Sequence, residues 1–174
     1  MRLAPKDKPV RLAQMTPRKE LFVKVKQALA TIEGIELIDL QRGQFDNPEN
    51  GYPEIWTACL IQVMPIAYET MTQHVQEGEC EFHIDFYCKD GWTDQHLGTA
   101  DPEEGLMELD ILDKITDTIQ FLQGEQFKPV QQVREEELRL SDDGIMSYRI
   151  TFTTRIYRQT PYPYTGRRLQ IASN

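Results

Sequence analysis

The side chains best suited to chemistry lie close together in the segment 80–88. Cys80 and His83 have the separation found in half of a zinc site. The segment alternates apolar and polar residues, which is typical of a β-strand, and an odd separation in a strand points two side chains to opposite faces. The pattern therefore excludes a metal ion shared by Cys80 and His83.

His83 and Asp85 share the polar side of this predicted strand with Glu79 and Glu81. A hydrogen-bonded His–Asp pair can act as a general base or bind a metal. The same residues can also be ordinary cross-strand partners on a solvated or interfacial face, and this is the interpretation that we favour. We predict no metal and no catalytic dyad at His83, because strand alternation separates it from Cys80.

A second group of polar side chains, Asp90, Asp94 and His96, lies in a long acidic loop over residues 89–104. Such a group could bind a cation, but it lacks the spacing and the glycine of an EF-hand. The sequence contains no glycine-rich phosphate loop, no Gly-x-Ser-x-Gly elbow and no His-Glu-x-x-His motif. It therefore predicts no catalytic, cofactor-binding or metal-binding residue, and a protein that is not an enzyme.

Two helices and about five strands are expected to position these side chains. Thr16 followed by Pro17 predicts a helix start, and apolar residues then recur at helical spacing up to Ile32. A second apolar stripe predicts a helix over residues 104–123, with Gly124 at its end. The expected strands cover residues 35–40, 54–64, 79–88, 128–140 and 145–158, the last two joined as a hairpin at Asp143-Gly144.

This order, α-β-β-β-α-β-β, predicts an α+β fold with one mostly antiparallel sheet of about five strands and two helices packed on one face. Residues 54–64 are apolar on both sides, so this strand is expected inside the sheet. The polar segment 68–77 is either a short helix or an extended protrusion. The expected core residues are Phe22, Val25, Leu29, Leu60, Phe82, Ile84, Phe86, Leu112, Ile115, Ile119, Ile150 and Phe152.

Charge is unevenly distributed along the 174 residues, whose net charge is −9. Residues 1–30 carry a net charge of +6, residues 31–127 carry −18 and residues 128–174 carry +3. An acidic body repels nucleic acid, while basic ends can reach an acidic surface such as a neighbouring copy of the chain, although solvated chain ends also tend to be charged. We expect a flexible basic segment over 1–15, a single domain over 16–158 and an extended arm over 159–174.

The cysteines and the hydropathy pattern indicate the cellular compartment. Cys59, Cys80 and Cys88 are odd in number and fall in predicted strands, which favours buried free thiols. No apolar run approaches the roughly 20 residues that span a bilayer, and the basic start lacks the apolar region of a secretory signal. We therefore expect a cytoplasmic protein with no membrane partner and no cofactor.

The order of the elements resembles that of the tail terminator or tail completion proteins of long-tailed bacteriophages. The resemblance covers about residues 17–158 and rests on architecture. It is carried by the first helix with Gly34-Ile35 after it, the loop from Asn47-Pro48 to Tyr52-Pro53 before Glu54-Ile55-Trp56, the alternating strand 79–88, the helix with Leu109-x-x-Leu112-x-x-Ile115, and the closing hairpin.

This resemblance implies a non-enzymatic phage or prophage tail assembly protein. Such a protein oligomerises, as a ring, at the end of the tail tube and joins the tube to head-side connector proteins. It is expected in the cytoplasm of the bacterial host during assembly and then in the virion tail. Two alternatives stay open: a small monomeric or dimeric adaptor that presents an acidic sheet face, and an enzyme with an unrecognised site.

A ring needs two complementary surfaces on each subunit, because a head-to-tail contact joins different patches of the same chain. The arm after residue 158 contains prolines that exclude a helix, together with tyrosines and arginines, which are enriched in interfaces. A disordered tail with incidental aromatics is the alternative for this arm. The residues expected to carry self-association are Glu79, Glu81, Asp85, Arg149, Arg155, Tyr162, Tyr164, Arg167 and Arg168.

Overall fold

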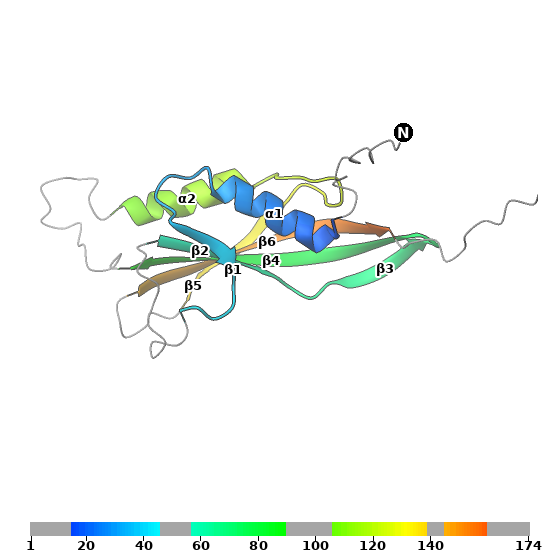
Figure 1. Cartoon of the computed structure of the whole chain (residues 1–174), viewed down its shortest axis with the longest axis horizontal. Helices are drawn as coiled ribbons and strands as arrows, with labels where there is room; N and C mark the ends of the chain where they lie inside the picture. The colour runs from blue at the N-terminus through cyan, green and yellow to red at the C-terminus, as the bar shows by residue number, and fades with distance from the viewer. Residues whose placement is uncertain (1–14, 46–56, 90–105, 139–144, 160–174) are drawn as a thin grey trace, which may run out of the picture.

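The computed structural model describes residues 15–45, 57–89, 106–138 and 145–159. In these residues two helices cover one face of a six-stranded, mostly antiparallel sheet (Figure 1), so the predicted α+β fold is confirmed. The sheet has one strand more than the sequence suggested. None of the helices in these four ranges is long and apolar enough to cross a membrane.

The first helix, α1, spans Pro17–Leu29 and begins where the sequence predicts. The Thr16 hydroxyl accepts a hydrogen bond from the Lys19 N–H at 3.4 Å, and proline occupies the first turn, where its missing N–H leaves no bond unmade. The helix ends three residues earlier than expected. Ile32 remains buried nonetheless, because its N–H donates to the Leu29 carbonyl at 3.0 Å and holds the next turn against the sheet.

The second helix, α2, spans Met107–Ile119 and buries Ile111, Leu112, Ile115 and Ile119. Leu112, Ile115 and Ile119 of the predicted stripe are buried, but Leu109 is 49% exposed and Ile111 takes its place in the core. The helix also ends before the predicted residue 123. Gln120 has an extended ψ of 128° and Phe121 a positive φ of 66°. The Phe121 N–H then donates to the Val130 carbonyl at 2.8 Å, so a contact across the following turn replaces the next helical bond.

A buried carboxylate fixes the turn after α2. Glu20 of α1 is 3% exposed and accepts hydrogen bonds from the backbone N–H groups of Glu125 at 2.7 Å and Gln126 at 3.1 Å. Gly124 lies directly beside it. A Cβ on Gly124 would lie 2.6 Å from a Glu20 carboxylate oxygen and 2.3 Å from the Phe127 ring, so only glycine fits. Gly124 therefore serves this packed turn rather than the end of the helix.

The sheet has the order β1-β2-β4-β6-β5, with β3 also paired to β4. β1 and β2 are parallel, and every other pair is antiparallel. The predicted interior position of β2 and the predicted neighbours β5 and β6 are both confirmed. The strands are β1 Leu37–Leu40, β2 Thr57–Val63, β3 Ala67–Thr72, β4 Val75–Lys89, β5 Gln131–Glu137 and β6 Ile145–Gln159.

The segment 68–77 is extended, which was one of its two predicted forms. It makes up most of β3 and the first residues of β4, so β4 begins four residues before the predicted start at Glu79. Gly78 permits this pairing, because a Cβ there would lie 2.6 Å from Ile66 Cγ2 and 2.9 Å from the Ala67 carbonyl oxygen. In Figure 1 the ends of β3, β4 and β6 extend together beyond α1.

The main core lies between the helices and the sheet. Ten of the twelve predicted core residues are buried there, and two differ. Phe22 is only half-buried, because it follows Leu21 by about 100° around the helix and reaches the rim of the apolar stripe. Leu60 is fully buried but on the opposite face of the sheet, because it alternates with Cys59 and Ile61, which face the helices.

The three cysteines are free and buried, as predicted. Burial raises the pKa of the Cys80 thiol to about 11 and also raises the pKa of Cys59. A thiol whose pKa is higher in the folded state contributes stability below its ordinary value of 9.0, and this contribution is lost as the pH rises through 11.

We expect the native protein at pH 8 to react slowly with a thiol-specific disulfide reagent, and the protein in guanidinium chloride to react rapidly at three thiols. The thiolate is the reacting form, and both burial and the raised pKa suppress it in the native state. Absorbance of the released thiol measures the rate. Rapid release of one equivalent from the native protein would show that one cysteine is accessible.

Candidate functional site

The face of the sheet that points away from the helices, hereafter the polar face, carries the residues of β4 and β6 that were selected from the sequence. Strand β4 places alternate side chains on it, and β6 places a partner opposite each one. The cross-strand pairs on this face are Glu77 and Tyr157, Glu79 and Arg155, Glu81 and Thr153, His83 and Thr151, Asp85 and Arg149, and Tyr87 and Ser147.

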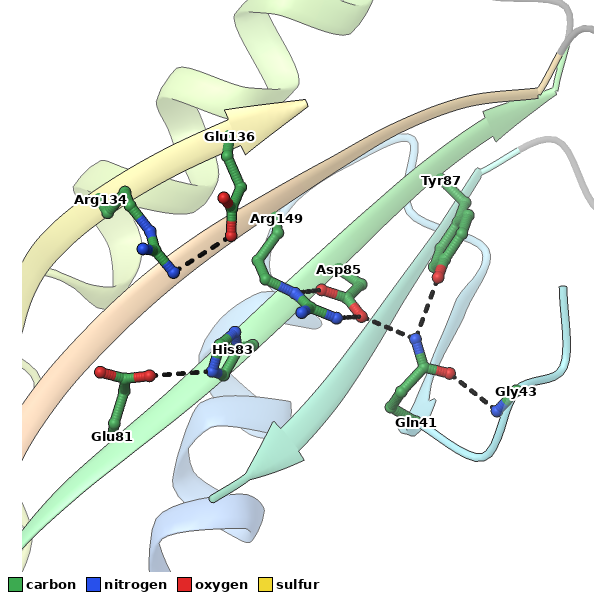
Figure 2. Close-up of polar contacts among 9 residues, drawn as sticks. All are labelled: Gln41, Gly43, Glu81, His83, Asp85, Tyr87, Arg134, Glu136 and Arg149. Carbon is green, nitrogen blue, oxygen red and sulfur yellow. Dashed lines mark hydrogen bonds and ion pairs between the residues drawn. The ribbon is translucent and has the colours of Figure 1, made fainter. Parts of the chain in front are cut away.

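An ion pair joins Asp85 and Arg149 at the centre of the polar face, as Figure 2 shows. Arg149 Nε donates to Asp85 Oδ1 at 2.7 Å and Arg149 Nη2 donates to Asp85 Oδ2 at 2.8 Å. Gln41 Nε2 also donates to Asp85 Oδ2 at 2.7 Å and to the Tyr87 hydroxyl oxygen at 3.0 Å. The Gly43 N–H donates to Gln41 Oε1 at 3.0 Å and holds the amide in this orientation.

Asp85 is therefore a cross-strand partner, as the sequence favoured, but its position is buried and not solvated. Asp85 is 0% exposed, whereas the Arg149 side chain is 25% exposed. The hydrogen bond to Asp85 raises the pKa of Arg149, and burial opposes this shift. A bidentate pair with a third donor satisfies the carboxylate within one chain, so its charge is neutralised without a neighbouring subunit.

His83 does not form the pair with Asp85 that the sequence left open. Its Nε2 lies 3.1 Å from Glu81 Oε1 (Figure 2), while Asp85 is engaged by Arg149 and Gln41. His83 is 4% exposed, and its Nδ1 and the neighbouring Thr151 Oγ1 have no hydrogen-bond partner in the described residues. Within these residues no group of three or more His, Cys, Asp or Glu could hold a metal ion.

An apolar cluster covers the end of the polar face next to Tyr87. The Phe45 ring stacks on the Tyr87 ring with a centroid distance of 4.4 Å, and Leu60 is buried in the same cluster. An open cleft of about 660 Å³ lies beside it, lined by Arg42, Arg149 and eight further residues. Gln41 and Phe45 could not be assigned to this site from the sequence, because a loop of turn-forming residues carries no periodic pattern that would orient them.

The opposite end of the polar face remains charged and exposed. Arg155 has a side chain that is 68% exposed and lies 3.6 Å from Glu77 Oε1, which also accepts a hydrogen bond from the Tyr157 hydroxyl at 2.8 Å. Glu79 is exposed, and the Glu81 side chain is 50% exposed. Among the described members of the predicted set, Glu79, Glu81 and Arg155 are thus the most exposed charged residues.

The other predicted residues lie outside the described ranges. They are Tyr162, Tyr164, Arg167 and Arg168 of the arm, and Asp90, Asp94 and His96 of the acidic loop. A further charged surface lies on the predicted hairpin. Strand β5 presents exposed Glu135, Glu136 and Glu137 at the edge of the sheet, and Arg134 Nη2 lies 3.2 Å from Glu136 Oε1.

The fold is similar to that of a solved structure, although the sequence has no match among families or curated proteins. No protein-family model matches this sequence, and no curated protein matches it. Among solved structures, a chain from the virion of a native gene transfer agent particle is similar, with a TM-score of 0.57 and 12% sequence identity. The similarity covers 82% of this chain and 98% of that chain. The fold is shared with a virion protein. At this identity the likeness concerns the fold alone.

Proposed function

We propose that this protein is a non-enzymatic structural component of a phage or phage-like particle. In this proposal, copies of the chain assemble as a ring at the end of the tail tube and join it to head-side proteins. The observation that carries the proposal is the shared fold with a chain of a gene transfer agent virion, a phage-like particle, over 98% of that chain. The order of helices and strands, which resembles that of tail terminator and tail completion proteins, supports the position at the tail end.

The distribution of exposed charge supports self-association. Glu79 and Glu81 offer acidic groups on β4, and Arg155 offers a cation whose side chain is 68% exposed. A heterologous contact brings different patches of two copies together, so one chain can supply both the acidic and the basic side. We assign to this contact Glu79, Glu81 and Arg155 and, from the arm, Tyr162, Tyr164, Arg167 and Arg168.

Asp85 and Arg149 stabilise the sheet within one chain in this proposal and do not form the main contact between copies. Their ion pair is completed within one chain at 2.7 Å and 2.8 Å, and only the Arg149 side chain retains exposure. The ion pair links the two longest strands, β4 and β6, at the middle of the polar face. It therefore stabilises the strand pair that carries the exposed charged residues. Arg149 keeps a partly exposed edge for a neighbouring copy.

Purified protein examined by negative-stain microscopy and light scattering at low and high salt tests the proposal. We expect rings at low salt and weaker association at high salt, because exposed charge pairs are screened beyond about 8–10 Å at physiological ionic strength. We expect Arg155→Glu to weaken association, whereas Lys26→Glu, the same change of charge on exposed Lys26 of α1, should not.

The alternatives give different results in the same experiment. A constant monomer or dimer mass at every salt and protein concentration would contradict the ring and favour a small adaptor with an acidic sheet face. Equal association of the Arg155→Glu and Lys26→Glu variants, with both folded, would move the contact away from the polar face.

A further inference from the structure

The outer edge of β3 is free in the described part of the chain. β3 pairs only with β4 there, and β1, which covers β2 through Ala58–Ile61, does not reach it. Five of its six residues are exposed, and Tyr68 is half-buried. Such an edge presents unpaired backbone N–H and C=O groups and is a template for another strand.

Strand β3 has few of the features that protect an edge from pairing. It contains no lysine and no proline, and its one charged residue is Glu69. The register is regular where Ala67–Thr70 face Gln76–Glu79, and it shifts only between Thr70 and Thr72. An exposed edge with regular geometry and β-forming residues pairs readily unless something covers it.

The arm that follows β6 has a sequence suited to cover such an edge. Residues 160–166 read Thr-Pro-Tyr-Pro-Tyr-Thr-Gly. In an extended strand the N–H groups of alternate residues point to the same edge. Pro161 and Pro163 therefore remove donors from one edge only, while Thr160, Tyr162 and Tyr164 retain every donor on the other. Proline in sheets is confined to edge strands, with its nitrogen facing solvent.

We propose that residues 160–166 of one copy add as a strand to the free edge of β3 in a neighbouring copy. This inference rests on the proposed function, since it names the segment and the edge through which copies join. The two prolines also close the outer side of the added strand, so pairing stops after one strand. The residue before each proline is biased toward extended backbone, which reduces the conformational entropy lost on docking.

The geometry favours a neighbouring copy over the chain's own β3. Gln159 ends β6 opposite Val75 of β4, and β4 lies between β6 and β3. From β6 to a position outside β3 is three strand spacings, about 14 Å at roughly 4.8 Å each, which takes at least about four residues. The segment that can pair begins at residue 160, directly after β6. The arm can reach the β3 edge of its own chain only beyond Pro163, and Tyr162 and both prolines would then be used up in the connection and could not pair.

Charge is complementary between the two elements. Glu69 on β3 and Glu79, one strand further in on β4, are exposed, and neither forms an ion pair with another described residue. They line a hollow of about 260 Å³ together with Glu77, so that three carboxylates face one cation, Arg155, there. Residues 160–174 carry Arg167 and Arg168 and no acidic residue. The arginines follow the pairing segment directly, so they can lie near these carboxylates once it is docked.

A matched pair of proline substitutions tests strand pairing. Thr160 and Thr165 have the same side chain but opposite parity, so Thr160→Pro removes a donor from the pairing edge and Thr165→Pro removes one from the closed edge. Labelled peptides of residues 159–171 are titrated into the full chain carrying Thr160→Pro, whose own arm competes poorly. We expect the unchanged and Thr165→Pro peptides to bind equally, and the Thr160→Pro peptide to bind about ten-fold more weakly.

Hydrogen exchange of the full chain locates the bound peptide. We expect slower exchange at residues 67–72 and no change at β5. Equal binding of the two proline peptides, no binding of the unchanged peptide, or protection only at another edge would each overturn the inference.

The same measurements separate this inference from the proposed function. Peptide binding does not require a ring. Rings that form without protection at β3 would refute the arm assignment and leave the proposed function standing. A peptide bound at β3 of a chain that never forms rings would refute the ring and leave the pairing of the arm with β3 standing.

Discussion

Replacing Phe152 with alanine is expected to lower the free energy of unfolding by about 3–5 kcal/mol, the usual cost of removing a fully buried aromatic ring. Phe152 is 0% exposed and its ring stacks on that of Phe82, with centroids 5.4 Å apart. The two residues face each other across β4 and β6, beneath the helices. The cavity would therefore open in the centre of the core. Urea unfolding followed by circular dichroism measures the loss.

Met71→Ala is the control for this substitution. Met71 is 57% exposed in β3, so its truncation should change the free energy of unfolding by less than about 0.5 kcal/mol. Similar unfolding midpoints for Phe152→Ala and the parent would show that Phe152 does not face the helices, and the assignment of the two sheet faces would then be reversed.

Arg149→Met is expected to destabilise the protein by about 3–5 kcal/mol, because removing one partner of a buried ion pair leaves an uncompensated charge. Asp85 is 0% exposed and, among the residues that the structure describes, would keep only the hydrogen bond from Gln41. Methionine preserves the aliphatic length of the arginine, so the loss reports the charge more than the packing. The same unfolding experiment measures it.

The double variant Asp85→Leu with Arg149→Met tests whether the uncompensated charge of Asp85 causes the destabilisation. Replacing both partners removes the stranded charge, so the double variant should be more stable than Arg149→Met alone. Arg134→Met is the exposed control, since the pair of Arg134 with Glu136 is solvated and worth less than about 1 kcal/mol. Equal destabilisation by Arg149→Met and Arg134→Met would contradict the buried role of the Asp85 pair.

Much of the fold follows from local patterns in the sequence. Thr16 and Pro17 predicted the first residue of α1, because the cap and the proline act on their own turn. The alternation of Phe82, Ile84 and Phe86 with polar residues predicted which face of β4 meets the helices. Both signals are carried by residues that are neighbours along the chain.

Other features could not be predicted because their partners are remote. Residues 75–78, Val-Gln-Glu-Gly, have no clear alternation of their own, and they form a strand because β3 and the last residues of β6 pair with them. The end of α2 is set by the contact from Phe121 to Val130 and not by helix propensity, which is weak and easily overridden by tertiary contacts. The burial of the charged Glu20 is explained by hydrogen bonds from Glu125 and Gln126, which are more than 100 residues away along the chain.

For the candidate site, the sequence by itself determined that His83 and Asp85 lie on the face opposite the core, since side chains along a strand must alternate. The sequence did not determine whether the side chains on that face are exposed to solvent. Arg149, 64 residues away along the chain, and Gln41, 44 residues away, bury Asp85 and satisfy its charge. Only the tertiary structure brought them there, because burial and ion pairing depend on distances in space that no local pattern encodes.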